Sequence, residues 1–221
     1  MRFLNVPVAA IGILATALSL SAQKPGQVVQ GIPPRISPAE YQAQGKAGQI
    51  TIGAELAGHG VPTPEATFTS EDYIVVELGL FGAPGSRIVL SPEDFSLRVN
   101  GKKVPMPAQP YGLVVKSLKD PEWEATVATI VAKSKTSVAG SGGGGGGGGQ
   151  GDPPPPPPKM PIETRRAMEL KVQKASLPEG DRALPVAGLI YFQYSGKVKG
   201  MKSVELVYAG PAGKATVALQ P

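Results

Sequence analysis

Two runs near the middle of the chain cannot form part of a packed core. Residues 142–149 are all glycine, and residues 153–158 are all proline. Polyglycine loses too much backbone entropy on folding, and polyproline has no N–H donors and is restricted to the extended polyproline II form. We therefore expect two strand-rich pieces joined by a solvated tether, with a disordered Gly/Pro-rich linker over residues 136–161.

The first 22 residues are typical of a secretory signal peptide. Arg2 supplies a positive charge, and an apolar stretch of about 13–15 residues follows within residues 6–20. This stretch is shorter than the roughly 18–20 residues that a membrane span needs, although an uncleaved anchor is the alternative. Cleavage is expected after Ser21 or Ala22. The protein is then exported to the periplasm or the cell exterior, with no stable membrane insertion after cleavage.

Composition excludes several classes of site. The chain has no cysteine, so disulfides, a lipoprotein anchor and thiolate metal sites are excluded. The formal net charge is +5, and the lysines are scattered rather than clustered with aromatic residues. This pattern favours anionic polymers of the cell envelope as partners over nucleic acid. We expect no metal and no cofactor.

Alternating apolar and polar residues predict short β-strands on both sides of the tether. The expected strands are 49–56, 73–81, 87–90, 95–99, 187–194, 204–208 and 215–219. The dipeptide Asn100-Gly101 is typical of a two-residue hairpin turn, because both positions require positive φ. A return strand is expected to begin at Lys102 and Lys103 and to end at Pro105 and Pro107, because proline cannot donate to a strand ladder.

The second piece contributes one expected helix, over residues 162–175. Ile162, Met168, Val172 and Ala175 fall on one face of this helix. A unit of about three strands and one weak helix is marginal alone, which favours one domain over two. The chain is thus expected to form an all-β, immunoglobulin-like antiparallel β-sandwich with one short helix, interrupted by the linker. Its expected parts are a signal peptide (1–22), a flexible segment (23–47), the first strands (48–135), the linker (136–161) and the helix with the remaining strands (162–221).

Four stretches give the chain a resemblance to a known family. These are 73–78, the 95–101 hairpin, 188–192 and 204–208. The arrangement resembles bacterial secreted immunoglobulin-like domains of the telokin-like class, over most of the chain outside the signal and the tether. The chain lacks the cysteine pair of antibody-type domains. The resemblance implies an extracytoplasmic interaction or structural module, and fold analogy alone assigns no activity.

Five residues are candidates for binding. Trp123, between acidic residues after a proline, and the nearby Tyr111 are candidates for an aromatic platform for a sugar ring or a partner loop, or for side chains that close the sandwich. Lys197, Lys199 and Lys202 form a basic hairpin end that would meet anionic polymers, and the simpler interpretation is a solvated turn. The proline run is a candidate ligand for an aromatic groove or, more simply, a stiff spacer.

Catalytic equipment is sparse in the sequence. His59 is the only histidine, so no metal site with a pair of histidines can be built, and no Gly-x-Ser-x-Gly motif is present. We therefore predict a non-enzymatic exported module that binds or scaffolds an envelope protein or an anionic or glycan polymer. The alternatives are a carbohydrate-binding module that uses Trp123 and Tyr111, a hydrolase of unfamiliar type, and a subunit that adds a strand to a partner.

Overall fold

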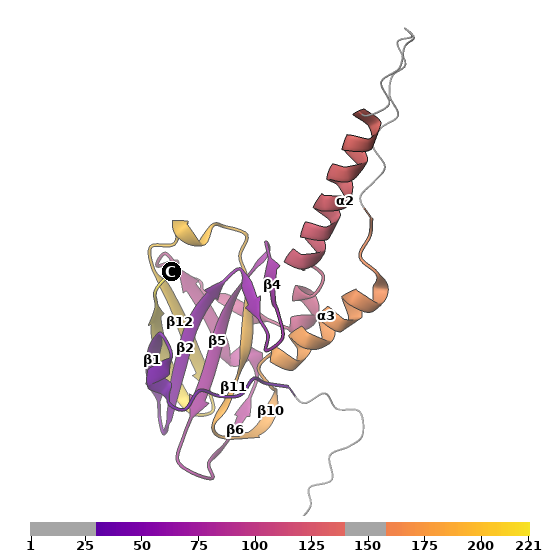
Figure 1. Ribbon diagram of the computed structural model, residues 1–221. Helices are drawn as coiled ribbons and strands as arrows, with labels where there is room; N and C mark the ends of the chain where they lie inside the picture. The colour runs from indigo at the N-terminus through magenta and orange to yellow at the C-terminus, as the bar shows by residue number, and fades with distance from the viewer. Residues whose placement is uncertain (1–29, 140–157) are drawn as a thin grey trace, which may run out of the picture.

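A computed structural model describes residues 30–139 and 158–221, with side chains described to Ala132 in the first part. The predicted signal peptide and most of the predicted linker lie outside these residues. The described chain is mainly antiparallel strands in a sandwich (Figure 1), which confirms the predicted all-β fold class.

The elements follow one another along the chain as thirteen strands and a few helices within the described residues. The strands are β1 (Ala43–Ala47), β2 (Ile50–Gly58), β3 (Gly60–Pro62), β4 (Thr67–Ser70), β5 (Tyr73–Phe81), β6 (Arg87–Leu90), β7 (Phe95–Val99), β8 (Met106–Gln109), β9 (Leu118–Lys119), β10 (Gly180–Ala183), β11 (Val186–Gln193), β12 (Val204–Gly210) and β13 (Gly213–Leu219). The α-helices are α1 (Tyr111–Val114), α2 (Pro121–Ala139) and α3 (Ile162–Ala175), and the 3₁₀ turns are η1 (Pro38–Glu40), η2 (Pro92–Asp94) and η3 (Val198–Gly200).

The main sheet folds over on itself to make the sandwich. Its eight strands run in the order β1-β2-β5-β11-β8-β7-β12-β13. The fold occurs at β8, whose first two residues pair with β7 and whose last two pair with β11. The two outermost strands also approach each other, since Gln42 Nε2 donates to the Gln220 carbonyl at 3.0 Å. The two halves of the sheet therefore enclose one core.

Strand β11 is buried on both faces because a core lies on each side of it. Ile190 and Phe192 point into the core between the two halves of the sheet. Leu189 and Tyr191 point the other way and pack under α3. The residues of α3 in this outer core are Met168, Val172 and Ala175. Ile162, which the sequence places on the same helical face, is 62% exposed.

Strands from the two pieces of the chain alternate within the main sheet. Strand β11, which follows the tether, lies between β5 and β8, which precede it. Strand β12 pairs with β7 on one side and with β13 on the other. Every strand of the second piece in this sheet except β13 therefore has a hydrogen-bonded neighbour from the first piece.

The structure matches several expected boundaries and departs from others. Strands β5, β6 and β7 and helix α3 have the predicted bounds, and Asn100 and Gly101 both have positive φ as the hairpin turn requires. The expectation that the return strand would run from Lys102 to the prolines is wrong. Strand β8 begins only at Met106, and Pro107 lies where its pairing changes from β7 to β11, so its missing N–H is tolerated there.

Helix α2 is an element that the sequence pattern does not predict. It begins at Pro121, with Asp120 as its N-cap, because Asp120 Oδ1 accepts from the Glu122 N–H at 3.0 Å. Figure 1 shows α2 projecting from the sandwich, with only its first turn near the sheets. Within the described residues, no helix combines the length and apolar character needed to cross a membrane.

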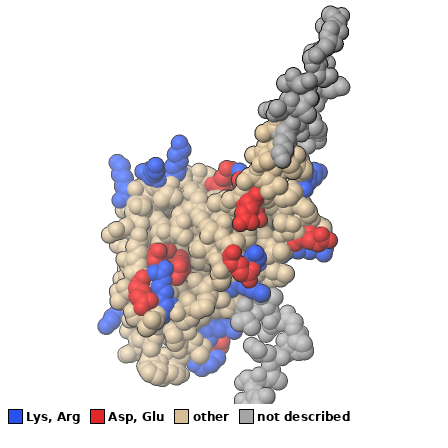
Figure 2. All heavy atoms as spheres, viewed as in Figure 1, with Lys and Arg blue, Asp and Glu red and all other residues tan. Residues whose placement is uncertain are grey.

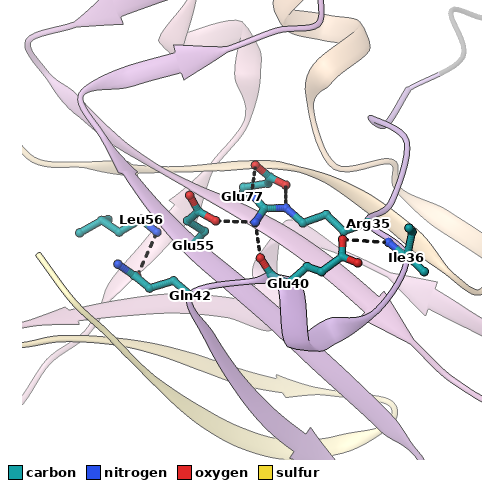
Figure 3. A network of polar contacts seen from close by, with 7 residues as sticks. All are labelled: Arg35, Ile36, Glu40, Gln42, Glu55, Leu56 and Glu77. Carbon is teal, nitrogen blue, oxygen red and sulfur yellow. Dashed lines mark hydrogen bonds and ion pairs between the residues drawn. The ribbon is translucent and has the colours of Figure 1, made fainter.

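Residues 30–42, part of the segment 23–47 that the sequence predicts to be flexible, form a strap over the outer face of the main sheet. Ile32 bridges to Ala187 of β11. Farther along, the Arg35 guanidinium lies 2.7 Å from Glu55 of β2 and donates from Nε and Nη2 to both carboxylate oxygens of Glu77 of β5, each at 3.1 Å (Figure 3). The strap therefore ties three neighbouring strands together before it continues into β1.

Tyr41 completes the strap by lying flat on the sheet. Its ring sits 4.5 Å beneath the Arg35 guanidinium and covers Gly53 and Gly79, two glycines on neighbouring strands. Burial raises the pKa of the Tyr41 hydroxyl, whose oxygen has no hydrogen-bond partner among the described residues. Glycine is required at both strand positions because any side chain there would overlap the ring.

Substitution of Gly53 tests this packing. A Cβ at Gly53 would lie 2.5 Å from Cδ2 and 3.2 Å from Cβ of Tyr41, so the tyrosine cannot avoid it by moving only its tip. We expect Gly53→Ala to lower the free energy of unfolding by about 1–3 kcal/mol in urea denaturation. Gly112→Ala is the control, because a Cβ there has no neighbour within 4 Å. An equal loss in both variants would contradict the assigned role of Gly53.

Candidate functional site

His59 joins the loops at one end of the sandwich. It lies at the corner between β2 and β3, with Nδ1 2.8 Å from the Tyr73 carbonyl and Nε2 2.8 Å from the Gly196 carbonyl. A carbonyl oxygen only accepts, and which of the two ring nitrogens donates depends on the tautomer of the imidazole. The ring also stacks on Tyr194. Both nitrogens face backbone of the same protein, which leaves neither directed at a substrate or a metal.

Asn100 brings two lysine-rich loops together at this end. Asn100 Oδ1 accepts from the backbone N–H of Lys202 at 2.6 Å, and the Asn100 N–H donates to the Ser203 carbonyl at 2.8 Å. These bonds fasten the β7–β8 turn to the loop between β11 and β12. We name the resulting group the lysine end. Its members are Lys102, Lys103, Lys197, Lys199 and Lys202.

The backbone that carries the lysine end is fixed by buried side chains and local hydrogen bonds. The η3 turn is closed by bonds from the Gly200 N–H to the Lys197 carbonyl and from the Met201 N–H to the Val198 carbonyl, both at 2.9 Å. Met201 is buried in the core, and Val198 packs against that core. The loop is therefore anchored, while its lysine side chains extend into solvent.

All five lysines of the lysine end are exposed, and within the described residues none forms an ion pair. Figure 2 shows basic side chains standing out from the end of the molecule at which η3 lies in Figure 1. The positive charges on this end are therefore available to a partner.

Two carboxylates border the lysine end. The turn Glu71-Asp72 adjoins it, because the Asp72 carbonyl accepts from the Tyr194 N–H at 2.7 Å. Glu71 forms an ion pair with Lys119 at 2.7 Å, and the hydrogen bond from that ammonium group lowers the pKa of the Glu71 carboxyl. The charge of Glu71 is thus balanced by Lys119, and Asp72 is the bordering carboxylate without an ion pair in the described chain.

The two aromatic candidates lie on different elements. Tyr111 begins α1 and lines a cavity of about 20 Å³ together with Ser176 and Tyr191. Ser176 Oγ lies 3.0 Å from the Tyr191 hydroxyl, and burial raises the pKa of Tyr191. Trp123 lies in the first turn of α2. In the described part of the chain no ring contact joins Tyr111 to Trp123, so the structure does not assemble them into one aromatic platform.

Sequence reasoning identifies three residues of the lysine end and misses Lys102 and Lys103. The pattern places those two in a return strand rather than at a binding surface. The sequence feature that indicates an exposed basic turn here is the Asn100-Gly101 dipeptide followed directly by two lysines. Their juxtaposition with Lys202 depends on the pairing of β7 with β12, two strands separated by about half the chain.

Comparison with protein families, curated proteins and solved structures assigns no role to the lysine end. No protein-family model matches the chain, and no curated protein or solved structure is significantly similar to it. Function must therefore be inferred from the lysine end and its surroundings.

Proposed function

We propose that this protein is an exported, non-enzymatic β-sandwich that binds a polyanion of the cell envelope through the lysine end. The observation that carries the proposal is the convergence of five exposed lysines from two distant loops, fastened by Asn100. Export is supported by the N-terminal sequence, and an interaction or structural role fits the resemblance to telokin-like secreted domains.

Several cations at one end favour a partner with several anions. A single exposed ion pair contributes only about 0.2–1 kcal/mol, because water and salt screen it. A polymer with repeated phosphate or carboxylate groups can engage several lysines at once, and their contributions then accumulate along one chain. Such binding is sensitive to salt, since the Debye length is about 8 Å at physiological ionic strength.

A non-catalytic role is supported by how the polar side chains are used. The nitrogens of His59 both face backbone carbonyls. The hydroxyls of Ser70 and Ser117 contact each other at 2.9 Å, and the Ser176 hydroxyl donates to the Val172 carbonyl at 2.8 Å. Nucleophilic catalysis requires a nucleophile that is hydrogen-bonded to a general base. The side chains of His59, Ser70, Ser117 and Ser176 do not form such a pair.

Replacement of the lysine end tests the proposal. The variant carries Lys→Gln at positions 102, 103, 197, 199 and 202, and binding to soluble polyphosphate is measured by titration at low and at physiological salt. We expect an affinity at least about tenfold lower than that of the unchanged protein, because five exposed charge contacts are lost. Binding by the unchanged protein should weaken as salt rises.

A matched variant separates the position of the charges from their number. It carries Lys→Gln at 46, 116, 159, 174 and 214, five exposed lysines on other parts of the surface. The matched variant loses the same formal charge but keeps the lysine end, so it should bind polyphosphate nearly as well as the unchanged protein. Equal losses in both variants would mean that net charge, rather than the lysine end, governs binding and would overturn the proposal.

A further inference from the structure

Packing against the sandwich contributes little to the stability of helix α2. Within the described residues, neither hydrophobic core contains a residue of α2. Helix α2 contacts the sandwich at its first turn, where Pro121 and Glu122 line a cleft with α3 and β4. Lys119 also lies 4.0 Å from Glu124. Beyond this first turn, the helix stands away from the strands (Figure 1).

The composition of α2 does not suit an isolated helix. Its sequence includes Thr126, Val127, Thr129, Ile130 and Val131, and β-branched residues have lower helix propensity than Ala or Leu. The hydroxyls of Thr126 and Thr129 bond back to carbonyls four residues earlier, an interaction that slightly weakens helices. Helices in proteins depend mainly on packing of an apolar face. A helix of this composition is therefore expected to pack against something outside its own sandwich.

One face of α2 is apolar. Trp123, Val127 and Ile130 recur at spacings of four and three residues, the repeat that places side chains on a single helical stripe. Ile130 is 45% exposed, and Trp123 and Val127 are partly exposed. Thr129 lies on a different face of the helix. The stripe has the pattern of a seam between two paired helices.

Charge along α2 selects the partner and its direction. The first turn carries Glu122 and Glu124, and the sequence of the second half carries Lys133 and Lys135. Two copies of α2 side by side in opposite directions bring the acidic half of each to the basic half of the other, and their helix dipoles also oppose. Two parallel copies would instead place like charges together.

We propose that α2 pairs with α2 of a second copy of this chain, in the antiparallel direction and along the stripe of Trp123, Val127 and Ile130. A register that places Val127 opposite Ile130 of the partner also places position 124, a glutamate, opposite position 133, a lysine. The resulting dimer has two-fold symmetry, and its sandwiches lie at opposite ends of the helix pair.

The size of the contact predicts a weak dimer. A helix of 19 residues is about 28 Å long, and one helix pair buries less than the roughly 800 Å² per partner of a standard stable interface. We therefore expect association with a Kd in about the micromolar range, visible by sedimentation at higher protein concentration and lost on dilution.

Disulfide trapping tests the pairing and its direction. Because the chain has no cysteine, Val127→Cys and Ile130→Cys each introduce a single thiol. The two variants, distinguished by a mass tag, are mixed and oxidised under mild conditions. We expect disulfides mainly between unlike chains. Disulfides mainly between like chains would overturn the antiparallel direction, and trapping no faster than for Gly112→Cys, a thiol outside α2, would overturn the pairing.

Two substitutions on opposite faces of α2 supply a second readout. Val127→Asp places a charge on the proposed seam and should weaken the dimer at least about tenfold. Thr129→Asp introduces the same side chain on another face and should leave the sedimentation behaviour nearly unchanged. Thermal unfolding of the sandwich should be the same in both variants, since neither core includes these positions. An equal effect of both substitutions on association would overturn the proposed seam.

Discussion

A chain cut within the glycine run at residues 142–149 is expected to keep its two fragments together and to unfold in one transition. The physical reason is the strand order. Strand β11 forms hydrogen bonds with β5 on one side and β8 on the other, and β12 pairs with β7. A fragment of residues 158–221 alone would retain only the β12–β13 pairing of the main sheet.

The cut protein gives a clear measurement. After cleavage at an engineered protease site, gel filtration should show both fragments in one peak, and thermal unfolding should show one transition that shifts with protein concentration, because the fragments must associate to fold. The fragment 158–221 expressed alone should give the circular dichroism of an unfolded chain. Separate peaks with a melting transition for each fragment would contradict the one-domain interpretation.

Phe192→Ala is expected to cause a large loss of stability for a single side-chain truncation. Phe192 is fully buried in β11, where it is paired with Ile74 of β5 and Ala108 of β8. Truncation removes an aromatic ring from the point where strands of the two pieces meet and leaves a cavity. We expect a loss of about 3–5 kcal/mol in the free energy of unfolding, measured by urea denaturation.

Two controls establish that the cavity causes this loss. Phe192→Leu keeps most of the apolar volume and should cost less than about 1.5 kcal/mol. Leu113→Ala truncates a side chain that is 42% exposed in α1 and should change stability by about 0.5 kcal/mol or less. A loss for Phe192→Ala no larger than that for Leu113→Ala would mean that β11 does not hold the two pieces together.

The strands are predictable where one face is buried and the other exposed. In β7, buried Phe95, Leu97 and Val99 alternate with partly exposed residues, and the bounds agree with the sequence pattern. The sequence indicates which segment forms β11 but not which strands lie beside it. The reason is that β11 is buried on both faces, so its pattern does not reveal its neighbours. Its position between β5 and β8 depends on contacts between residues far apart in sequence.

The sequence pattern does not predict helix α2, although residues typical of a helix N-terminus are present. Asp120 followed by Pro121 is a favourable N-cap and first helical residue, but the same pair is also typical of a turn. The β-branched residues that follow reduce helix propensity and conceal the apolar stripe. The strap is unpredictable for a different reason, because Arg35, Glu55 and Glu77 come together only when the strands are in register.

The candidate site is predictable in part. Lys197, Lys199 and Lys202 are close in sequence, so their clustering follows from one short loop. Lys102 and Lys103 join them because β7 pairs with β12 and Asn100 bonds to the backbone of that loop. The predicted hairpin end at Lys197, Lys199 and Lys202 is instead a loop that joins two strands not paired with each other, β11 and β12, whereas Lys102 and Lys103 follow the turn of the β7–β8 hairpin. Sequence spacing alone therefore cannot place the five lysines at one end of the molecule.

A lysine footprint distinguishes binding at the lysine end from a general effect of positive charge. The protein is treated with a small acylating reagent, with and without bound polyphosphate, and modification of each lysine is quantified by mass spectrometry. We expect protection of Lys102, Lys103, Lys197, Lys199 and Lys202, with Lys46 and Lys214 modified equally in both states. Protection spread evenly over all lysines, or confined to Lys46 and Lys214, would contradict the lysine end as the binding surface.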